Sequence, residues 1–394
     1  MDTARGLAWK EHPAAVFPSP ADHTAPRDLT AGLTSLQPEC GAGELPGELP
    51  GELVKRRLRL ALTACADALF FCKLLLYTRE PERAGWIRGT APRSPPSRAD
   101  TGLRVGIVGA GRLGRQLARC LIETSGLRAE EIRISTRRPE TLGDFRERGV
   151  ICSYDNVALA SWAHVLFLCC LPCQLPGVCA EIEDHVGQAC VVYSLVSAVP
   201  LSRLRRLLGP VSLVRPEYRS AGATRGRTRD CTTAALRDPD LLKSTNPRDS
   251  RASRFPETSL YAALNTCRER GLCHRRSLRV LNALLQGAET WGEAPRGSRL
   301  RTEDLVSAEC AASLSEGSLF PWFDLSAVQS KETPLSRHVA QSPRLQETLA
   351  LLYFAVLGIH TMDVEESDNP RYPDDGTWRS LITRVTRTME RGGV

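Results

Sequence analysis

Short runs of hydrophobic residues alternate with amphipathic stretches between residues 103 and 214. Each run is bounded by polar residues or glycines and is short, which is typical of a strand covered on both faces. The amphipathic stretches have apolar positions three or four residues apart, which favours helices. The pattern predicts strands at 103–108, 131–136, 150–153, 165–170, 189–193 and 211–214, and helices at 111–124, 140–148, 173–186 and 201–208.

This alternation predicts an α/β fold, in which a Rossmann-type, doubly wound parallel sheet carries helices on both faces. We assign residues 101–216 to this domain. In open parallel sheets of this kind, ligands bind in the crevice at the carboxyl ends of the strands. Functional residues are therefore expected in the loops that directly follow the strands.

The pattern changes after residue 216. Residues 217–258 carry many arginines and few large apolar side chains, which predicts a basic, flexible insertion. An arm that binds phosphate or acidic groups is the alternative for this segment. Residues 259–394 are interpreted as a mainly helical C-terminal domain, with helical periodicity at 260–270, 276–288, about 301–314 and 343–360.

The N-terminal part precedes the sheet and has a different composition. Residues 1–52 are rich in proline, glycine and small residues, which predicts a disordered N-terminal segment. Residues 53–100 are interpreted as a helix over 53–77 and a proline-rich linker. The helix is expected to dock on the later domain, with binding of a partner protein as the alternative. Its charged residues argue against a membrane span.

A glycine pattern follows the first predicted strand. Gly109, Gly111 and Gly114 have the spacing G-x-G-x-x-G and stand where a strand ends and a helix begins. In dinucleotide-binding folds such glycines allow a tight turn, a close approach of the backbone to a diphosphate, and close packing of helix on strand. The predicted diphosphate site consists of Gly109, Ala110, Gly111, Arg112, Leu113 and Gly114. A tight turn without a ligand is the alternative.

The end of the second predicted strand indicates which dinucleotide is bound. An acidic residue about 20 positions past the glycines holds the ribose of NAD, but this chain has Ser135, Thr136, Arg137 and Arg138 there. Hydroxyl and guanidinium groups suit the additional 2′-phosphate of NADP, to which arginine makes bidentate, charge-assisted hydrogen bonds. The sequence therefore favours NADP(H) as cofactor, with solvated arginines at a strand end as the alternative.

Composition limits the other function classes. The chain of 394 residues has a formal net charge of +7, but its arginines are spread along the sequence and no RNA or DNA module is recognisable, so nucleic acid is an unlikely partner. The 14 cysteines, without a secretory signal, favour a reducing, cytoplasmic location. Cys170 and Cys173 have C-x-x-C spacing, for which packing is the preferred interpretation over a redox or a zinc site. No metal site is predicted, and His164 is interpreted as structural.

Residues 103–215 resemble the NADP-binding domain of the pyrroline-5-carboxylate reductases. The matching segments are 105–111, 148–150, 164–168, Pro172 and 191–194. The resemblance implies a Rossmann fold, NADP(H) as cofactor, reduction of a C=N bond, and C-terminal helices that pair with a second copy. It also implies that Cys170, Leu171 and Pro172 flank the nicotinamide.

The chain departs from that family on the substrate side. The reductases have a Lys-Pro pair where this chain has Leu171-Pro172, and a small Ala-Ala-Gly segment where it has Val196-Ser197-Ala198. We therefore expect an NADPH-dependent oxidoreductase that reduces a C=N or C=O bond of a small-molecule substrate, with proline biosynthesis itself in question. The alternative is a non-enzymatic NADP-binding sensor or scaffold. No catalytic side chain is assigned from the sequence.

Overall fold

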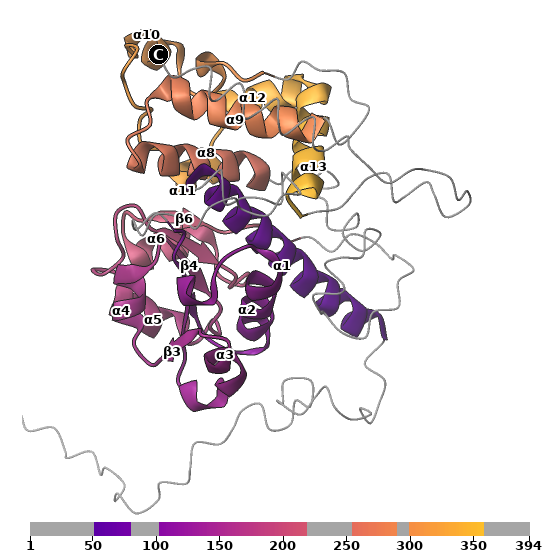
Figure 1. Cartoon of the computed structure of the whole chain (residues 1–394), viewed down its shortest axis with the longest axis vertical. Coiled ribbons are helices and arrows are strands. Elements are labelled where there is room, and N and C mark those ends of the chain that lie inside the picture. Colours follow the sequence, from indigo (N-terminus) through magenta and orange to yellow (C-terminus); the bar gives the residue numbers. More distant parts are fainter. Residues whose placement is uncertain (1–50, 80–101, 219–253, 290–298, 358–394) are drawn as a thin grey trace, which may run out of the picture. The chain divides into compact units, whose positions relative to one another are not determined.

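The computed structural model describes residues 51–79, 102–218, 254–289 and 299–357 of the 394-residue chain. Its helices and strands are labelled in Figure 1. The chain divides into two units, residues 1–54 and 55–394, and the sheet and the C-terminal helices belong to the second. Residues 1–50 of the expected disordered segment, the proline-rich linker, most of the basic insertion and the last 37 residues lie outside the described residues. The expected disordered segment was drawn to residue 52, but residues 51 and 52 are already helical.

Six parallel strands form one sheet, as predicted. They are β1 (Val105–Val108), β2 (Ile132–Ser135), β3 (Ile151–Ser153), β4 (Val165–Leu168), β5 (Val191–Ser194) and β6 (Ser212–Val214). The strand order is β3-β2-β1-β4-β5-β6. The chain builds outward from β1 in one direction and then in the other, so the strand order reverses between β1 and β4. Folds of this kind bind ligands at the carboxyl ends of the strands at that point. The Rossmann-type fold is confirmed.

The helices between the strands begin and end close to the predicted positions. They are α2 (Arg112–Thr124), α3 (Gly143–Glu147), α4 (Asn156–Trp162), α5 (Leu175–Ile182) and α6 (Leu201–Leu208). The helix expected at 140–148 is split into a 3₁₀ turn at Pro139–Thr141 and α3. Helix α4 was not predicted; the Asp155 carboxylate caps it by accepting a hydrogen bond from the Ala158 N–H.

The two faces of the sheet have separate cores. Ile107, Phe167 and Tyr193 belong to one buried cluster. Leu166 and Val192 belong to the other, together with apolar side chains of α4, α5 and α6. Successive side chains of a strand point to opposite faces, so each apolar strand supplies both cores. This explains why the strands read as uninterrupted hydrophobic runs.

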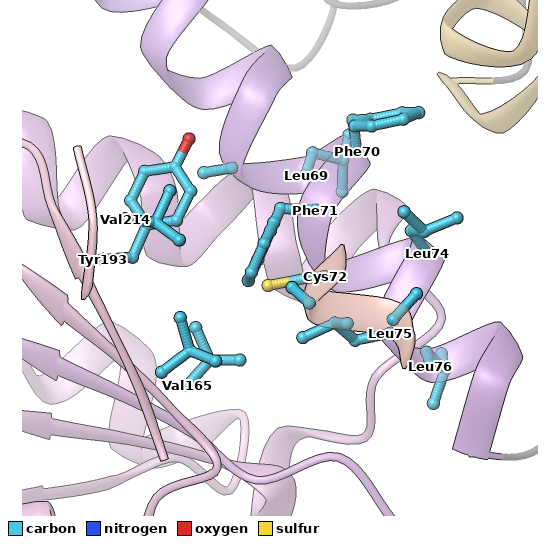
Figure 2. Close-up of a cluster of buried hydrophobic side chains, with 14 of the residues drawn as sticks. Leu69, Phe70, Phe71, Cys72, Leu74, Leu75, Leu76, Val165, Tyr193 and Val214 are labelled. Carbon is cyan, nitrogen blue, oxygen red and sulfur yellow. The ribbon is translucent and has the colours of Figure 1, made fainter. Parts of the chain in front are cut away.

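Helix α1 (Gly51–Arg79) contributes to the first cluster along much of its length. Figure 2 shows Leu69, Phe70, Phe71 and their neighbours on α1 close to Val165, Tyr193 and Val214 of the sheet. The Phe71 ring meets the Tyr193 ring edge-on at 5.3 Å, and Phe70 lies 5.1 Å from the Tyr353 ring. By length and composition the stretch Arg59–Arg79 is apolar enough to cross a membrane, but 83% of its apolar window is buried inside the structure. A helix that is hydrophobic on all sides fits this buried position.

Three charged side chains of α1, those of Asp67, Lys73 and Arg79, are buried, and each has a partner in the C-terminal region. Tyr353 donates its hydroxyl hydrogen to Asp67 Oδ1 at 2.8 Å, and Lys73 Nζ donates to the Val356 carbonyl at 3.0 Å. Arg79 forms an ion pair with Glu269. Burial raises the pKa of Asp67 to about 8 and lowers that of Lys73 to about 8, because it disfavours the charged form of each group.

The C-terminal region is helical, as expected. Its helices are α8 (Phe255–Glu269), α9 (His274–Glu289), α10 (Ala308–Ser313), α11 (Leu325–Ser330), α12 (Pro334–Gln341) and α13 (Pro343–Leu357). The basic insertion was drawn to residue 258, but α8 begins at Phe255, because Pro256 suits a first helical turn and Phe255 is 4% exposed. The short helices α11 and α12 were not predicted.

Helix α11 joins this region to the sheet. The Gln329 side chain donates to the Leu213 carbonyl and accepts from the Arg215 N–H, both at 2.8 Å. Leu213 belongs to β6, the last strand of the sheet, whose outer edge would otherwise carry unpaired backbone groups. Gln329 thereby satisfies two backbone groups at that edge and fixes α11 against it.

Candidate functional site

The glycine turn after β1 lies where the ends of three strands meet. Gly109 has φ +96°, a conformation that a side chain disfavours, and its N–H donates to the Ser135 carbonyl at 2.8 Å. A Cβ at this position would lie 3.0 Å from backbone atoms of Cys169 and Cys170. The turn is therefore in close contact with the segments that follow both β2 and β4, and only glycine satisfies both its conformation and its packing.

The other two glycines have different surroundings. A Cβ at Gly114 would lie 2.0 Å from the Gly109 carbonyl oxygen, so helix and turn pack without room for a side chain. A Cβ at Gly111 would meet nothing within 4 Å. Open space thus borders the turn at the start of α2, and no side chain among the described residues caps that helix. The first-turn N–H groups of a helix lack intrahelical acceptors and attract anions, so this cradle fits a diphosphate.

The segment after β2 presents the predicted cations to solvent. Arg137 and Arg138 are exposed, and neither guanidinium has a hydrogen-bond or ion-pair partner within the described part of the chain. The Thr136 N–H donates to the Ser153 carbonyl at 2.9 Å, which ties this segment to the end of β3. Ser135 is only 2% exposed, and its carbonyl is engaged by Gly109.

A further arginine, which the sequence did not single out, lies between these two segments. Arg115 Nε donates to the Ala110 carbonyl at 3.0 Å, and its Nη2 donates to Thr141 Oγ1 at 2.7 Å. Thr141 Oγ1 in turn donates to the Arg138 carbonyl at 2.8 Å. Arg115 was missed because its partner Thr141 is brought near only by the 3₁₀ turn after β2, and local spacing gives no signal of that contact.

The loop after β4 lies on the other side of the glycine turn. The Cys169 N–H donates to the Val108 carbonyl at 2.8 Å, which places Cys170 beside the turn. Leu171 is 60% exposed, and Pro172 begins the bend into α5. Burial raises the pKa of Cys170 to about 11, so this thiol keeps its proton at neutral pH. All three groups of predicted site residues therefore meet at the carboxyl ends of β1, β2 and β4.

A cavity of about 340 Å³ lies between the loops after β4 and β5. The residues that line it are Pro172, Cys173, Leu175, Pro176, Ala198, Val199, Pro200, Arg203 and Leu207. Arg215 fixes one of these loops, because its guanidinium donates to the Ser197 and Val199 carbonyls, both at 2.7 Å. Arg203 is the one charged residue of the lining.

His164 lies at the opposite end of the sheet. Its Nδ1 accepts a hydrogen bond from the Arg104 N–H at 3.1 Å, at the amino end of β4. Burial, together with the positive charges of Arg79 and Arg104, lowers the pKa of His164 to about 3. The imidazole is therefore neutral at physiological pH and has a structural role. Within the described ranges, no three Cys, His, Asp or Glu side chains gather as a metal site.

Comparison with known proteins agrees with this geometry. A family model described as "NADP oxidoreductase coenzyme F420-dependent" matches residues 104–196, which include the glycine turn and the loops after β2 and β4. The mouse NADP-dependent oxidoreductase domain-containing protein 1 is 39% identical over 322 residues, covering 78% of this chain and 87% of the mouse protein. The chain belongs to this family. It therefore carries an NADP-dependent oxidoreductase domain.

Pyrroline-5-carboxylate reductases are a second group of similar proteins, and the curated ones match a shorter part of this chain. Bovine pyrroline-5-carboxylate reductase 3 is 32% identical over 111 residues, or 28% of this chain and 36% of the reductase. Among solved structures, a pyrroline-5-carboxylate reductase from Coxiella burnetii shares 20% identity, with 65% of this chain and 96% of that chain covered and a TM-score of 0.28. The Plasmodium falciparum pyrroline carboxylate reductase with NADP bound shares 11% identity, with 64% of this chain and 95% of that chain covered and a TM-score of 0.27.

Proposed function

We propose that this protein is an NADPH-dependent oxidoreductase that reduces a C=N or C=O bond of a small substrate, as a pyrroline-5-carboxylate reductase does. The observation that carries the proposal is the cradle formed by the glycine turn. Gly109 and Gly114 each exclude a side chain by contact with backbone, whereas the space beside Gly111 is open. A turn that only connected β1 to α2 would not require open space at its middle glycine.

Different groups of residues in the site would bind different parts of the cofactor. The backbone N–H groups at Gly111–Gly114 would hold the diphosphate at the start of α2. Arg137 and Arg138, exposed and unpaired within the described ranges, would bind the 2′-phosphate, with Thr136 beside them. Cys170, Leu171 and Pro172 would flank the nicotinamide side. When bound, the reduced nicotinamide supplies a hydride.

The cavity beside Pro172 is the candidate substrate site. Its lining is largely apolar, and the Arg203 guanidinium would pair with a carboxylate of the substrate. No carboxyl or imidazole group lines this cavity, and its one thiol is Cys173. Burial raises the pKa of the nearby Cys170 thiol to about 11. We therefore assign the protonation step to water, and to the chain the tasks of positioning the substrate and excluding bulk solvent.

Binding measurements test the cofactor assignment. NADPH and NADH are titrated against wild-type protein and against Arg137→Ala combined with Arg138→Ala, with intrinsic fluorescence as the signal. Removing both guanidiniums is expected to weaken NADPH by roughly 1.5–3 kcal/mol per lost charged hydrogen bond and to leave NADH almost unchanged. Equal affinities for the two cofactors, before and after the change, would remove the assignment of these arginines.

Turnover measurements test the reaction. NADPH oxidation is followed with pyrroline-5-carboxylate, other cyclic imines and keto acids, and Arg203→Gln serves as the substrate-site variant. We expect the variant to raise KM for carboxylate-bearing substrates while the affinity for NADPH stays the same. A substrate-site role for Arg203 is excluded if KM does not change.

The second candidate function is a non-enzymatic NADP-binding sensor or scaffold. The observation that favours it is that no carboxyl or imidazole group lines the cavity, where Arg203 is the one charged residue and Cys173 the one thiol. This candidate predicts tight NADPH binding and thermal stabilisation by the cofactor without turnover of any substrate on the panel.

The described cysteines are all free thiols, which supports the proposal of a cytoplasmic location. Pairing of two copies through the C-terminal helices remains a prediction, tested by the mass of the protein in solution.

A further inference from the structure

We propose that Arg115 determines specificity for the 2′-phosphate by bracing the diphosphate turn against the segment after β2. The inference rests on the proposed placement of NADP(H). It concerns a residue that lies outside the glycine pattern and outside the Ser135–Arg138 segment. Its basis is a continuous line of hydrogen bonds between the two phosphate-binding segments.

The line runs from the Ala110 carbonyl to the Arg138 carbonyl. Arg115 Nε donates to Ala110, Arg115 Nη2 donates to Thr141 Oγ1, and Thr141 Oγ1 donates to Arg138, at 3.0, 2.7 and 2.8 Å. Ala110 is the residue between the first two glycines, and Arg138 is a proposed 2′-phosphate ligand. Besides the direct hydrogen bond from the Gly109 N–H to the Ser135 carbonyl, the two segments are therefore linked through one guanidinium and one hydroxyl. We call this line the Arg115 brace.

The same face of α2 carries two further links to the segment 139–148, and they provide a reference. Arg119 pairs with Asp144 at 3.3 Å, and Glu123 pairs with Arg148 at 3.2 Å. Residues four apart on a helix share one face, so the three links succeed one another along α2. Only the first of them contacts the diphosphate turn. A role in cofactor binding should therefore be confined to Arg115.

The charge of Arg115 is suited to the 2′-phosphate as well. The side chain is half-buried, and two of its three guanidinium nitrogens are used by the brace, while no hydrogen bond or ion pair is found for Nη1 within the described residues. An arginine held by a fork of hydrogen bonds is pre-organised, so little side-chain entropy is lost when its remaining N–H groups bind an anion. The brace thus holds a further cation one hydroxyl away from the backbone of Arg138.

A purely structural role makes a different prediction. If Arg115 only fastens the segment 139–148 to α2, its loss would weaken the binding of NADPH and NADH by the same factor, or would change neither. The same is expected for the loss of Arg119. If the brace serves the 2′-phosphate, its loss weakens NADPH and leaves NADH almost unchanged. The ratio of the two dissociation constants therefore decides between the roles.

The experiment compares Arg115→Gln, Arg115→Lys, Thr141→Val and the matched control Arg119→Gln in the full chain. Kd is measured for NADPH, NADH and 2′,5′-ADP, and thermal unfolding without ligand confirms that each variant is folded. Arg115→Gln removes a charge-assisted contact to the 2′-phosphate. We therefore expect it to raise Kd for NADPH and for 2′,5′-ADP about tenfold or more, and to raise Kd for NADH less than about threefold. Arg115→Lys keeps the charge without the fork and should fall in between. Thr141→Val should weaken NADPH about threefold, and Arg119→Gln should change neither cofactor.

Three results would overturn the brace. In the first, the wild-type protein binds NADPH, and Arg115→Gln either changes the Kd values of NADPH and NADH by the same factor or changes neither. In the second, Arg119→Gln reproduces the selective loss, which would make it a general effect of charge on α2. In the third, the wild-type protein does not bind NADPH, and the proposed function then fails together with the brace.

Discussion

Helices α1 and α2 pack on the same face of the sheet, yet their polar side chains are used in opposite ways. On α2 the polar residues are exposed or half-buried, and their partners Thr141, Asp144 and Arg148 lie 25 or 26 residues away in the chain. On α1 the charged residues Asp67, Lys73 and Arg79 are buried, and their partners lie 190 to 286 residues away. The helix that forms the proposed site is therefore organised locally, whereas the helix that completes the core depends on the end of the described chain.

The difference shows that polar side chains on one face of the sheet contribute to stability in two different ways. Exposed pairs such as Arg119–Asp144 contribute little to stability because water screens them. A buried polar group costs free energy unless it is paired, so Asp67, Lys73 and Arg79 make the position of α1 depend on its partners. We therefore expect changes in α1 to act on stability, and changes around the start of α2 to act mainly on cofactor binding.

The largest expected effect is a pH dependence of stability caused by Asp67. Its pKa is raised from an ordinary value of 3.8 to about 8, so between these values the folded state keeps a proton that the unfolded state releases. Stability then falls as pH rises through this window, by on the order of 5 kcal/mol for a shift of this size. Asp67→Asn still accepts the Tyr353 hydroxyl hydrogen and should remove this slope in urea unfolding.

Lys73 is expected to change the stability in the opposite direction at higher pH. Its pKa is lowered from 10.5 to about 8, so above pH 8 the unfolded state binds the extra proton and stability rises with pH. The two groups together predict a stability minimum near pH 8, and Lys73→Met should flatten only the alkaline side. A profile that stays parallel to the wild type in Asp67→Asn would show that Asp67 is solvated in solution.

Truncating the aromatic contact of α1 is the next largest effect. Phe71 is fully buried against Tyr193, and Phe71→Ala is expected to lower the free energy of unfolding by about 3–5 kcal/mol through lost burial and a cavity. Arg119→Ala on the exposed face of α2 is the control, with an expected change within about 0.5 kcal/mol. Similar losses in both variants would mean that the two helices do not differ in the way described.

Two glycine substitutions separate packing from binding at the start of α2. Gly114→Ala places a methyl group against the Gly109 carbonyl and should cost about 1–3 kcal/mol of stability, together with NADPH affinity. Gly111→Ala meets no protein atom, so it should unfold like the wild type and still lose NADPH affinity. Calorimetry of unfolding and NADPH titration are both needed, and unchanged NADPH binding in Gly111→Ala would contradict the cradle.

The smallest expected effect is the coupling within an exposed ion pair of α2, for which a buried ion pair of α1 is the reference. A double-mutant cycle on Arg119–Asp144 should give a coupling of about 0.2–1 kcal/mol, because both groups are half exposed. The Arg79–Glu269 pair, with Arg79 only 6% exposed, should give a larger coupling, and breaking it should cost about 3 kcal/mol or more. Chemical denaturation measures both cycles, and equal couplings would remove the distinction between the helices.

The same contrast explains what the sequence could predict. The six strands, α2 and the glycine turn were predictable because their signals are local: apolar runs, glycine spacing and a 3.6-residue period. The length of α1 was predictable too, but not the reason for its charged residues, because Tyr353 and Glu269 are far away in the chain. Arg115 was missed for a related reason, since its partner Thr141 is positioned by tertiary structure.

The sequence separation of the α1 partners also has a consequence during protein synthesis. The ribosome delivers Asp67 first and Tyr353 286 residues later, an interval of roughly 15–60 s at translation rates of about 5–20 residues per second. Throughout that interval Phe70 lacks the Tyr353 ring that packs on it, although Tyr193, the partner of Phe71, is delivered much earlier. Chaperones that recognise apolar segments on emerging chains are thus expected to hold helix α1 until Tyr353 has been synthesised.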